Sequence, residues 1–315
     1  MSLRVSILGI GNMGKNHLRV LSILRGVTIV KIFDFNEEAL KLLSEEYDVS
    51  YTTNAEEALE GVDAAIIVTP TSTHYEYFKL CVGKVNNIFI EKPLAESYVQ
   101  AQEIEVLAKE NNIFVQCGFI ERFNPVVIEL KKILKDSTVI HSDFFRTNRL
   151  SNRITDVDVV VDLMIHDIDL ALYLNGPIKD IVAFGSKENG LIAFASASLI
   201  HENGSLSRII ASRMTEKKMR SIQVTTSDSF IDAELLRKEL QVHRQSSISK
   251  NENDSYIVSS LEQQIEVGPQ EALLAEVQAF LNVCSGDNSE QVPDLYAGVE
   301  SLRICELIMR SIENQ

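Results

Sequence analysis

Residues 159–176, VVVDLMIHDIDLALYLNG, place ionisable side chains in a helical pattern that is otherwise apolar. Gly176 and Pro177 end the helix, because glycine suits the position after a helix and proline cannot continue one. Offsets of four, three and four residues place four polar side chains on one face: Asp162, His166, Asp169 and Tyr173. An imidazole titrates near neutrality, so this face could exchange a proton with a substrate hydroxyl.

Asp162 stands one turn before His166, where a carboxylate can orient the imidazole and stabilise its cation. Two other interpretations fit the pair alone. It could be a satisfied polar pair inside a core, since buried polar groups normally find partners. It could also ligate zinc, but no cysteine or second histidine lies nearby, so no metal site is predicted. Asp169 and Tyr173 are expected to make supporting or core contacts.

The first 120 residues predict the scaffold for such a site. Short apolar runs alternate with helical patterns, which implies a parallel, doubly wound sheet. The expected strands are 4–10, 27–34, 63–70, 87–93 and 113–119, and the expected helices are 13–24, 36–46, 54–60 and 95–110. We therefore predict a dinucleotide-binding domain over 1–120.

The pattern changes after Phe119. Helix 124–136 and a strand near 138–146 precede the polar helix, and residues 180–267 alternate as strands. Asn-Gly at 189–190 and 203–204 predicts hairpins, so this sheet should be mostly antiparallel. We predict a second α/β domain over 121–315 with a large open sheet, a loop at 247–255, and closing helices near 270–284 and 294–312.

Composition limits the partners. The chain has 315 residues and a net charge of −15, which disfavours binding to nucleic acid or to an anionic membrane surface. No apolar run is long enough to span a membrane, and a strand begins almost at once, so no signal peptide is expected. The four scattered cysteines (Cys81, Cys117, Cys284 and Cys305) predict reduced thiols and a cytoplasmic location.

A nucleotide site is predicted where the first strand meets the first helix. The segment GIGNMG (9–14) has the GxGxxG spacing of Gly9, Gly11 and Gly14, with Asn12 and Met13 between them. These glycines permit a tight turn and close approach of a pyrophosphate to the helix N-terminus. Asp34 follows twenty residues later and can accept hydrogen bonds from adenine-ribose hydroxyls. It would repel a 2′-phosphate, so NAD is favoured over NADP; the alternative is a glycine-rich turn and a capping aspartate.

With TPTSTH (69–74), EKP (91–93) and the polar helix, the chain resembles the glucose–fructose oxidoreductase / inositol dehydrogenase / MocA family over essentially its whole length. The resemblance implies a Rossmann domain and a second α/β domain whose open sheet forms a homodimer or homotetramer. It also implies hydride transfer between a sugar or polyol hydroxyl and a nicotinamide cofactor.

The resemblance assigns roles by position. It places Thr69, Pro70, His74, Glu91 and Lys92 at the cofactor. Lys92 would also reach the substrate oxygen and act with Asp162 and His166 in catalysis. Either Lys92 or His166 could be the base. Met164 stands where the family usually has glycine, which leaves the packing of this helix open.

A narrower resemblance concerns ERFNP (121–125) and DVDVVVDLMIHDIDL (156–170). It points to the branch that oxidises the 3-hydroxyl of UDP-N-acetylglucosamine or related UDP-sugars. Guanidinium groups match phosphate oxygens in pairs, so four arginines are candidate diphosphate anchors, or else solvated loop charges: Arg122, Arg146, Arg149 and Arg153.

Two other functions remain open. An inositol or free-sugar dehydrogenase would need no diphosphate pocket. A dinucleotide-sensing regulator would need no catalytic residues, whereas this chain keeps Lys92, Asp162 and His166 together. His17 and Lys15, beside the glycine turn, are expected to cap the first helix or to be solvated.

Overall fold

The computed structural model describes residues 2–149, 157–250, 256–287, 289 and 291–314, with the backbone alone described over 245–250 and 256–260. The chain divides into two compact units. The first holds 1–123 and 271–303, and the second holds 124–270 and 304–315. The predicted boundary near 120 lies close to the first crossing at 123. The compact units differ from two consecutive domains, 1–120 and 121–315, because the chain returns to the first unit at Glu271.

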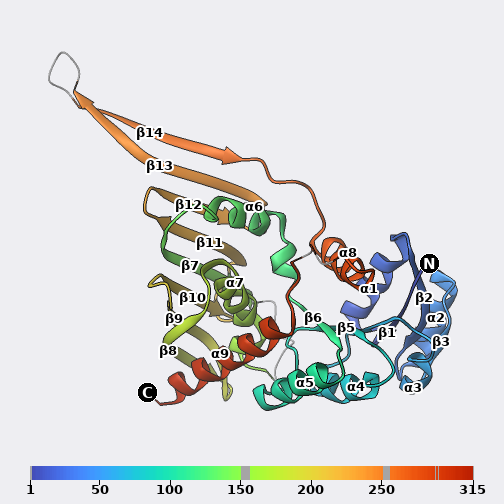
Figure 1. Cartoon of the computed structure of the whole chain (residues 1–315). Helices are drawn as coiled ribbons and strands as arrows, with labels where there is room; N and C mark the ends of the chain where they lie inside the picture. The colour runs from blue at the N-terminus through green and yellow to red at the C-terminus, as the bar shows by residue number, and fades with distance from the viewer. Residues whose placement is uncertain (1, 150–156, 251–255, 288, 290, 315) are drawn as a thin grey trace. The chain divides into compact units, whose positions relative to one another are not determined.

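A six-stranded parallel sheet forms the centre of the first unit, in the order β3-β2-β1-β4-β5-β6 (Figure 1). Its strands are β1 (Leu3–Leu8), β2 (Val27–Phe33), β3 (Tyr51–Thr52), β4 (Ala64–Ile67), β5 (Asn87–Glu91) and β6 (Phe114–Gly118). Residues 5–8 of β1 and all of β4 are buried on both faces, as expected for a parallel sheet covered by helices.

The connecting helices are α1 (Asn12–Ile23), α2 (Glu37–Tyr47), α3 (Ala55–Ala58), α4 (His74–Cys81) and α5 (Tyr98–Glu110). Asn36, Asn54 and Ser97 cap α2, α3 and α5 by accepting first-turn N–H bonds. Helix α8 (Ala272–Cys284) belongs to this unit because Val277 and Phe280 pack into its core. Strand β3 and helix α4 have no counterpart in the sequence prediction.

The second unit is built on an eight-stranded mixed sheet in the order β14-β13-β12-β11-β7-β10-β9-β8, in which β7 and β10 are parallel and the other neighbours antiparallel. The strands are β7 (Val139–Thr147), β8 (Ile178–Glu188), β9 (Leu191–His201), β10 (Leu206–Ser212), β11 (Met219–Thr226), β12 (Ser229–Glu234), β13 (Glu239–Lys250) and β14 (Tyr256–Ile265). This confirms the predicted α/β class with a large, mostly antiparallel sheet.

Hairpin chemistry sets the register at one edge. Asn189 and Gly190 both have positive φ and join β8 to β9 as the sequence predicts. At the opposite edge, the predicted loop over 247–255 is partly wrong, because residues 247–250 pair with β14 and end β13. Residues 251–255 lie outside the described residues.

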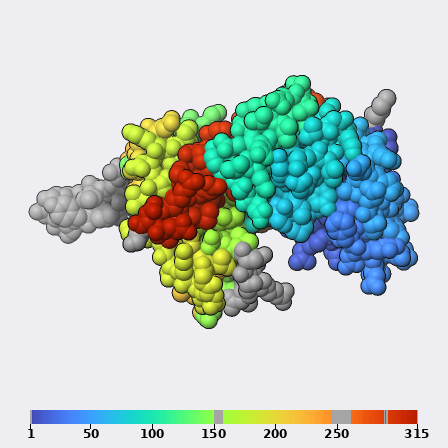
Figure 2. All heavy atoms as spheres, turned by 90° about the horizontal axis from the view of Figure 1, so that it is seen from below, coloured from blue at the N-terminus to red at the C-terminus, as the bar shows by residue number. Residues whose placement is uncertain are grey.

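Among the described residues, the helices that contact this sheet lie on one face of it. Helices α6 (Pro125–Leu134) and α7 (Ile165–Asn175) contact it, and the end of α9 (Leu295–Glu313) lies along β8, where Ala183 donates its N–H to Ser311. Figure 2 shows this red end of α9 against the yellow-green strands. Residues facing the helices, such as Phe144, Ala195 and Ile222, are buried, whereas their neighbours Phe145, Ser196 and Ser221 are partly exposed.

The predicted helix over 159–176 contains an irregular first turn. Residues Val160–Met164 form a π-helix, and regular α-helix runs from Ile165 to Asn175. A π-turn rotates the residues before it relative to those after it, so the predicted uniform face is divided. Asp162 and His166 remain partly exposed, but Asp169 is fully buried.

Candidate active site

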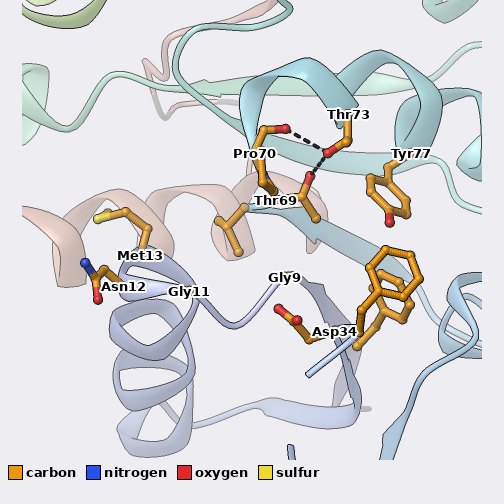
Figure 3. A pocket seen from close by; sticks show the side chains of 12 residues that line it. Gly9, Gly11, Asn12, Met13, Asp34, Thr69, Pro70, Thr73 and Tyr77 are labelled. Atoms are coloured by element: carbon orange, nitrogen blue, oxygen red, sulfur yellow. Dashed lines mark hydrogen bonds between the residues drawn. The ribbon is translucent and has the colours of Figure 1, made fainter. Parts of the chain in front are cut away.

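A cavity of about 620 Å³ opens in the first unit where β1, β2 and β4 end (Figure 3). The carboxyl ends of these strands lie at the point where the strand order reverses, which is where parallel α/β sheets bind nucleotides. Its walls come from the glycine turn, the end of β2, and the segment after β4: Gly9, Gly11, Asn12, Met13, Phe33, Asp34, Phe35, Val68, Thr69, Pro70, Thr73 and Tyr77. The sequence had placed seven of these twelve at the cofactor, namely Gly9, Gly11, Asn12, Met13, Asp34, Thr69 and Pro70.

The glycines of this turn differ in what a side chain at each position would contact. At Gly9, with φ +97°, a Cβ would lie 2.8 Å from the backbone nitrogen of Thr69; at Gly14 it would lie 2.1 Å from the Gly9 carbonyl oxygen. At Gly11 it would meet nothing within 4 Å. Gly11 is the N-cap of α1 and provides no side-chain cap, so the first-turn N–H groups have no acceptor from the cap residue. This arrangement fits a bound pyrophosphate.

Asp34 is held rigidly by backbone donors. Its Oδ2 accepts the Ile10 N–H at 2.8 Å, and its Oδ1 accepts the Asn36 N–H at 3.0 Å. Each carboxylate oxygen retains a further lone pair that can accept a ribose hydroxyl. The first of these bonds links Asp34 directly to the glycine turn, so the carboxylate has a fixed position relative to that turn.

Aromatic rings complete this part of the cavity, and the sequence analysis missed them. Phe33 makes edge contacts with Phe35 at 5.4 Å and with Tyr77 at 5.6 Å between ring centroids. Phe35 is 78% exposed although it directly follows the acid. An exposed ring beside a ribose site offers a stacking surface for a base. The signal was present in the sequence as FDF (33–35).

His74 does not line the cavity. It is buried, its Nε2 lies 2.9 Å from the Thr69 carbonyl oxygen, and its Nδ1 lies 2.9 Å from that of Pro93. Burial lowers the pKa of His74 below the ordinary 6.5, against smaller opposing effects of these carbonyls. His74 was predicted to contact the cofactor. In the structure its ring instead bridges the Thr69 loop and the segment after β5.

Glu91 also turns inward. It is 8% exposed; its Oε1 lies 3.0 Å from Nε2 of His17, and its Oε2 accepts the Lys92 N–H at 3.1 Å. The expectation that His17 caps or is solvated on α1 is wrong, because the ring is fully buried and paired. Lys92 itself is only partly buried.

In the second unit, the polar helix has a partner that the sequence did not reveal. Nη2 of Arg213 lies 2.9 Å from Oδ2 of Asp162, and Nη1 binds the Val157 carbonyl oxygen. Arg213 is 8% exposed, so this ion pair fixes the π-turn from the end of β10. His166 follows one turn later and is partly exposed.

The predicted phosphate anchors have different environments. Arg146 is buried in β7 and forms a bidentate pair with Asp167, with Nε–Oδ2 and Nη2–Oδ1 both at 2.8 Å. Both of these guanidinium nitrogens bind Asp167 in the interior, so Arg146 is not available as an anchor for a diphosphate. Arg149 is exposed and pairs with Glu216; Arg122 is partly buried in the first unit. Arg153 lies outside the described residues.

Among the described residues, no group of His, Cys, Asp or Glu side chains could hold a metal ion. None of the described helices is long and apolar enough to cross a membrane.

A glycine turn, an acid at the end of β2 and a parallel sheet together define a dinucleotide-binding fold. Residues 3–119 match the oxidoreductase family with an NAD-binding Rossmann fold, and residues 138–231 match the GFO/IDH/MocA C-terminal domain. The chain therefore belongs to the GFO/IDH/MocA family, as the sequence motifs indicated, and it uses NAD.

Individual relatives span the same length. UDP-N-acetylglucosamine 3-dehydrogenase of Acidithiobacillus ferrooxidans is 26% identical over 287 residues, covering 89% of this chain and 88% of the relative. Its solved structure has a TM-score of 0.89 at 24% identity and covers 100% of this chain and 99% of that one. Inositol 2-dehydrogenase of Rhizobium meliloti is 24% identical, covering 99% and 97% of the two chains.

Proposed function

We propose that this protein is an NAD-dependent dehydrogenase that oxidises the 3-hydroxyl of a UDP-N-acetyl sugar. The observation that carries the proposal is similarity to UDP-N-acetylglucosamine 3-dehydrogenase through both units, at 26% identity over 89% of the chain. The motifs ERFNP (121–125) and the Asp162–His166 helix support the same substrate class.

In this mechanism, His166 takes the proton of the substrate hydroxyl, because an imidazole changes charge near neutral pH. Asp162 favours the imidazolium that forms, and Arg213 holds Asp162 in place through the 2.9 Å ion pair. Lys92 binds the reacting oxygen and stabilises negative charge as it develops. The nicotinamide of a bound NAD would supply the hydride acceptor for the same carbon.

Cofactor binding falls to the first unit. Amides at the start of α1 would hold the pyrophosphate, Asp34 would accept the adenine-ribose hydroxyls, and the exposed ring of Phe35 would offer a stacking surface for the adenine. We propose that Thr69 and Pro70 line the path toward the nicotinamide. Glu91 and His74 support this region through the Lys92 and Pro93 backbone.

For the diphosphate of the substrate we propose Arg122 and Arg149, together with Arg153. Remote binding energy from the nucleotide would position the reacting hydroxyl. N-Acetylglucosamine without UDP should therefore be a poor substrate.

A free polyol is the second candidate, because the inositol 2-dehydrogenase of Rhizobium meliloti matches almost the whole chain. The deciding experiment offers NAD⁺ with UDP-N-acetylglucosamine, its uronic acid, N-acetylglucosamine, myo-inositol and glucose, and follows NADH absorbance. Oxidation of the UDP-sugars at carbon 3, shown by product NMR, supports the proposal. Oxidation of myo-inositol or glucose alone overturns it, and turnover of any of these alcohols rejects a purely regulatory role.

We further propose that the uncovered face of the second-unit sheet joins two copies of the chain, as the family resemblance implies. Its exposed apolar side chains include Val182, Phe184 and Ile200, and Phe184 is 60% exposed. A second copy would remove these side chains from water. Light scattering should show a dimer or tetramer for the wild type and a smaller species for Phe184→Glu. Leu42→Glu, at a 68% exposed position on α2, is the matched control.

A further inference from the structure

His17 and Glu91 form a buried pair in the first unit that the proposed chemistry does not use directly. His17 lies on α1, three residues after Gly14, and Glu91 is the last residue of β5. Nε2 of His17 lies 3.0 Å from Oε1 of Glu91. The His17 ring is fully buried and makes an edge contact with Phe89 at 5.1 Å between centroids.

The same carboxylate also contacts the backbone of Lys92. Oε2 of Glu91 accepts the backbone N–H of Lys92 at 3.1 Å. Strand β6 closes its other side, since a Cβ at Gly118 would lie 2.8 Å from this oxygen. One carboxylate therefore connects α1 to the backbone from which the Lys92 side chain leaves the strand.

Donation of a hydrogen bond to Glu91 explains why position 17 is a histidine better than core packing does. Nδ1 of His17 is buried without a hydrogen-bond partner among the described residues, so the ring carries an unsatisfied polar atom. That arrangement is unfavourable, and an apolar side chain would avoid it. What an apolar side chain cannot do is donate a hydrogen bond to Glu91.

We propose that His17 is a positioning residue for Lys92 and acts through the Glu91 carboxylate. The inference rests on the proposed function, in which Lys92 contacts the reacting oxygen. His17 holds Oε1, the carboxylate then presents Oε2 to the Lys92 N–H, and the direction of the lysine follows from that fixed backbone.

The first test needs no substrate. Amide hydrogen exchange of Lys92 is measured by NMR in the NAD-bound protein for wild type, His17→Leu and His17→Gln. Leu fills the space without a donor, whereas the Gln amide can still donate. Loss of a buried hydrogen bond should raise Lys92 exchange by about 10-fold or more in His17→Leu, with His17→Gln close to wild type. Asn16→Leu, on the exposed side of α1, is the matched control.

The second test uses whichever alcohol the wild type oxidises. His17→Leu should lower kcat by about 10- to 100-fold, because a misplacement of about 1 Å at a reacting group can cost on the order of 10². NADH affinity should stay near wild type, and His17→Gln should restore kcat. If His17→Leu does not fold, His17→Met replaces it.

The outcomes separate the two proposals. Absence of turnover with every alcohol defeats the proposed function, while the exchange result still decides the role of His17. A folded His17→Leu variant with unchanged Lys92 exchange, or with normal kcat, overturns the positioning role. Faster exchange along all of β5 overturns it too, because His17 would then support the strand as a whole.

Discussion

Charged side chains that the sequence analysis singled out have different kinds of partner in the two units. In the first unit, Asp34 is positioned by the backbone N–H groups of Ile10 and Asn36 and retains acceptor capacity toward a cavity. In the second unit, three of the charged residues that the sequence analysis singled out form ion pairs with other side chains. Arg146 pairs with Asp167, Asp162 with Arg213, and Arg149 with Glu216.

This difference explains where the sequence analysis succeeded. The glycine turn depends on spacing within six residues, and Asp34 follows Gly14 by twenty residues at the end of the next predicted strand. Both could therefore be located from the sequence alone. The partners of the second-unit charges lie 21, 51 and 67 residues away. The pairing of β7 with β10 and the packing of the helical segment 160–175 on these strands bring such distant positions together, and no local sequence pattern reports it.

Replacing Arg146 by Met tests the buried pair and should have the largest effect. Removing one partner leaves Asp167 charged and buried, which typically costs about 3–5 kcal/mol of unfolding free energy. The exposed Arg149→Ala should change that free energy by ~0.5 kcal/mol or less. Urea denaturation measures both.

The double variant Arg146→Met/Asp167→Leu is the control, since removing both charges relieves the penalty. It should be more stable than Arg146→Met alone. Equal stability of Arg146→Met and Arg149→Ala would contradict the difference between buried and exposed arginines.

His166→Asn tests whether the second unit supplies the base. Loss of a general base typically costs about 10²-fold or more in rate, so kcat should fall by that factor while NADH affinity stays unchanged. Stopped-flow hydride transfer and NADH fluorescence titration measure the two. His243→Asn, on the partly exposed face of the sheet, is the control. Near-normal turnover at saturating substrate would remove His166 from this role.

Other parts of the site could not be predicted because burial decides them. No sequence pattern separates His17, His74 and Glu91, which are buried, from Phe35, which is exposed. From hydrophobicity alone, Phe35 would be expected to be buried and the two histidines and Glu91 to be exposed. The π-turn was equally hidden, because Val160–Met164 has the composition of an ordinary helix.

Asp34→Ala tests whether the carboxylate of the first unit binds the cofactor. Hydrogen bonds to a charged acceptor are worth about 1.5–3 kcal/mol, so NAD affinity should fall by roughly 10- to 100-fold. NADP should bind better than it does to the wild type, because only NADP carries the 2′-phosphate that the acid repels. Calorimetric titration with both cofactors measures the change. A wild type that prefers NADP would show that this acid has been misinterpreted.

The smallest expected effect concerns two buried histidines, one in each unit. In the second unit, Nδ1 of His201 lies 2.7 Å from the Gly176 carbonyl oxygen and Nε2 lies 2.8 Å from the Ser207 hydroxyl, which also accepts from Asn175. A neutral ring fits this network, since it donates once and accepts once. Burial lowers the pKa of His201 below 6.5, as it does for His74 in the first unit.

The sign of the resulting pH dependence follows from proton binding. A histidine with a lowered folded pKa binds fewer protons in the native state than in the unfolded state, so stability rises with pH across that interval. The contribution is complete above pH 6.5 and is lost as the pH falls through the folded pKa. Urea denaturation between pH 7.5 and 5 should therefore show a declining unfolding free energy, with a slope of up to about 1.4 kcal/mol per pH unit for each histidine. His201→Gln should reduce this slope, and His243→Gln should not. A slope that is unchanged in both His201→Gln and His74→Gln would mean that neither ring is held neutral by its surroundings.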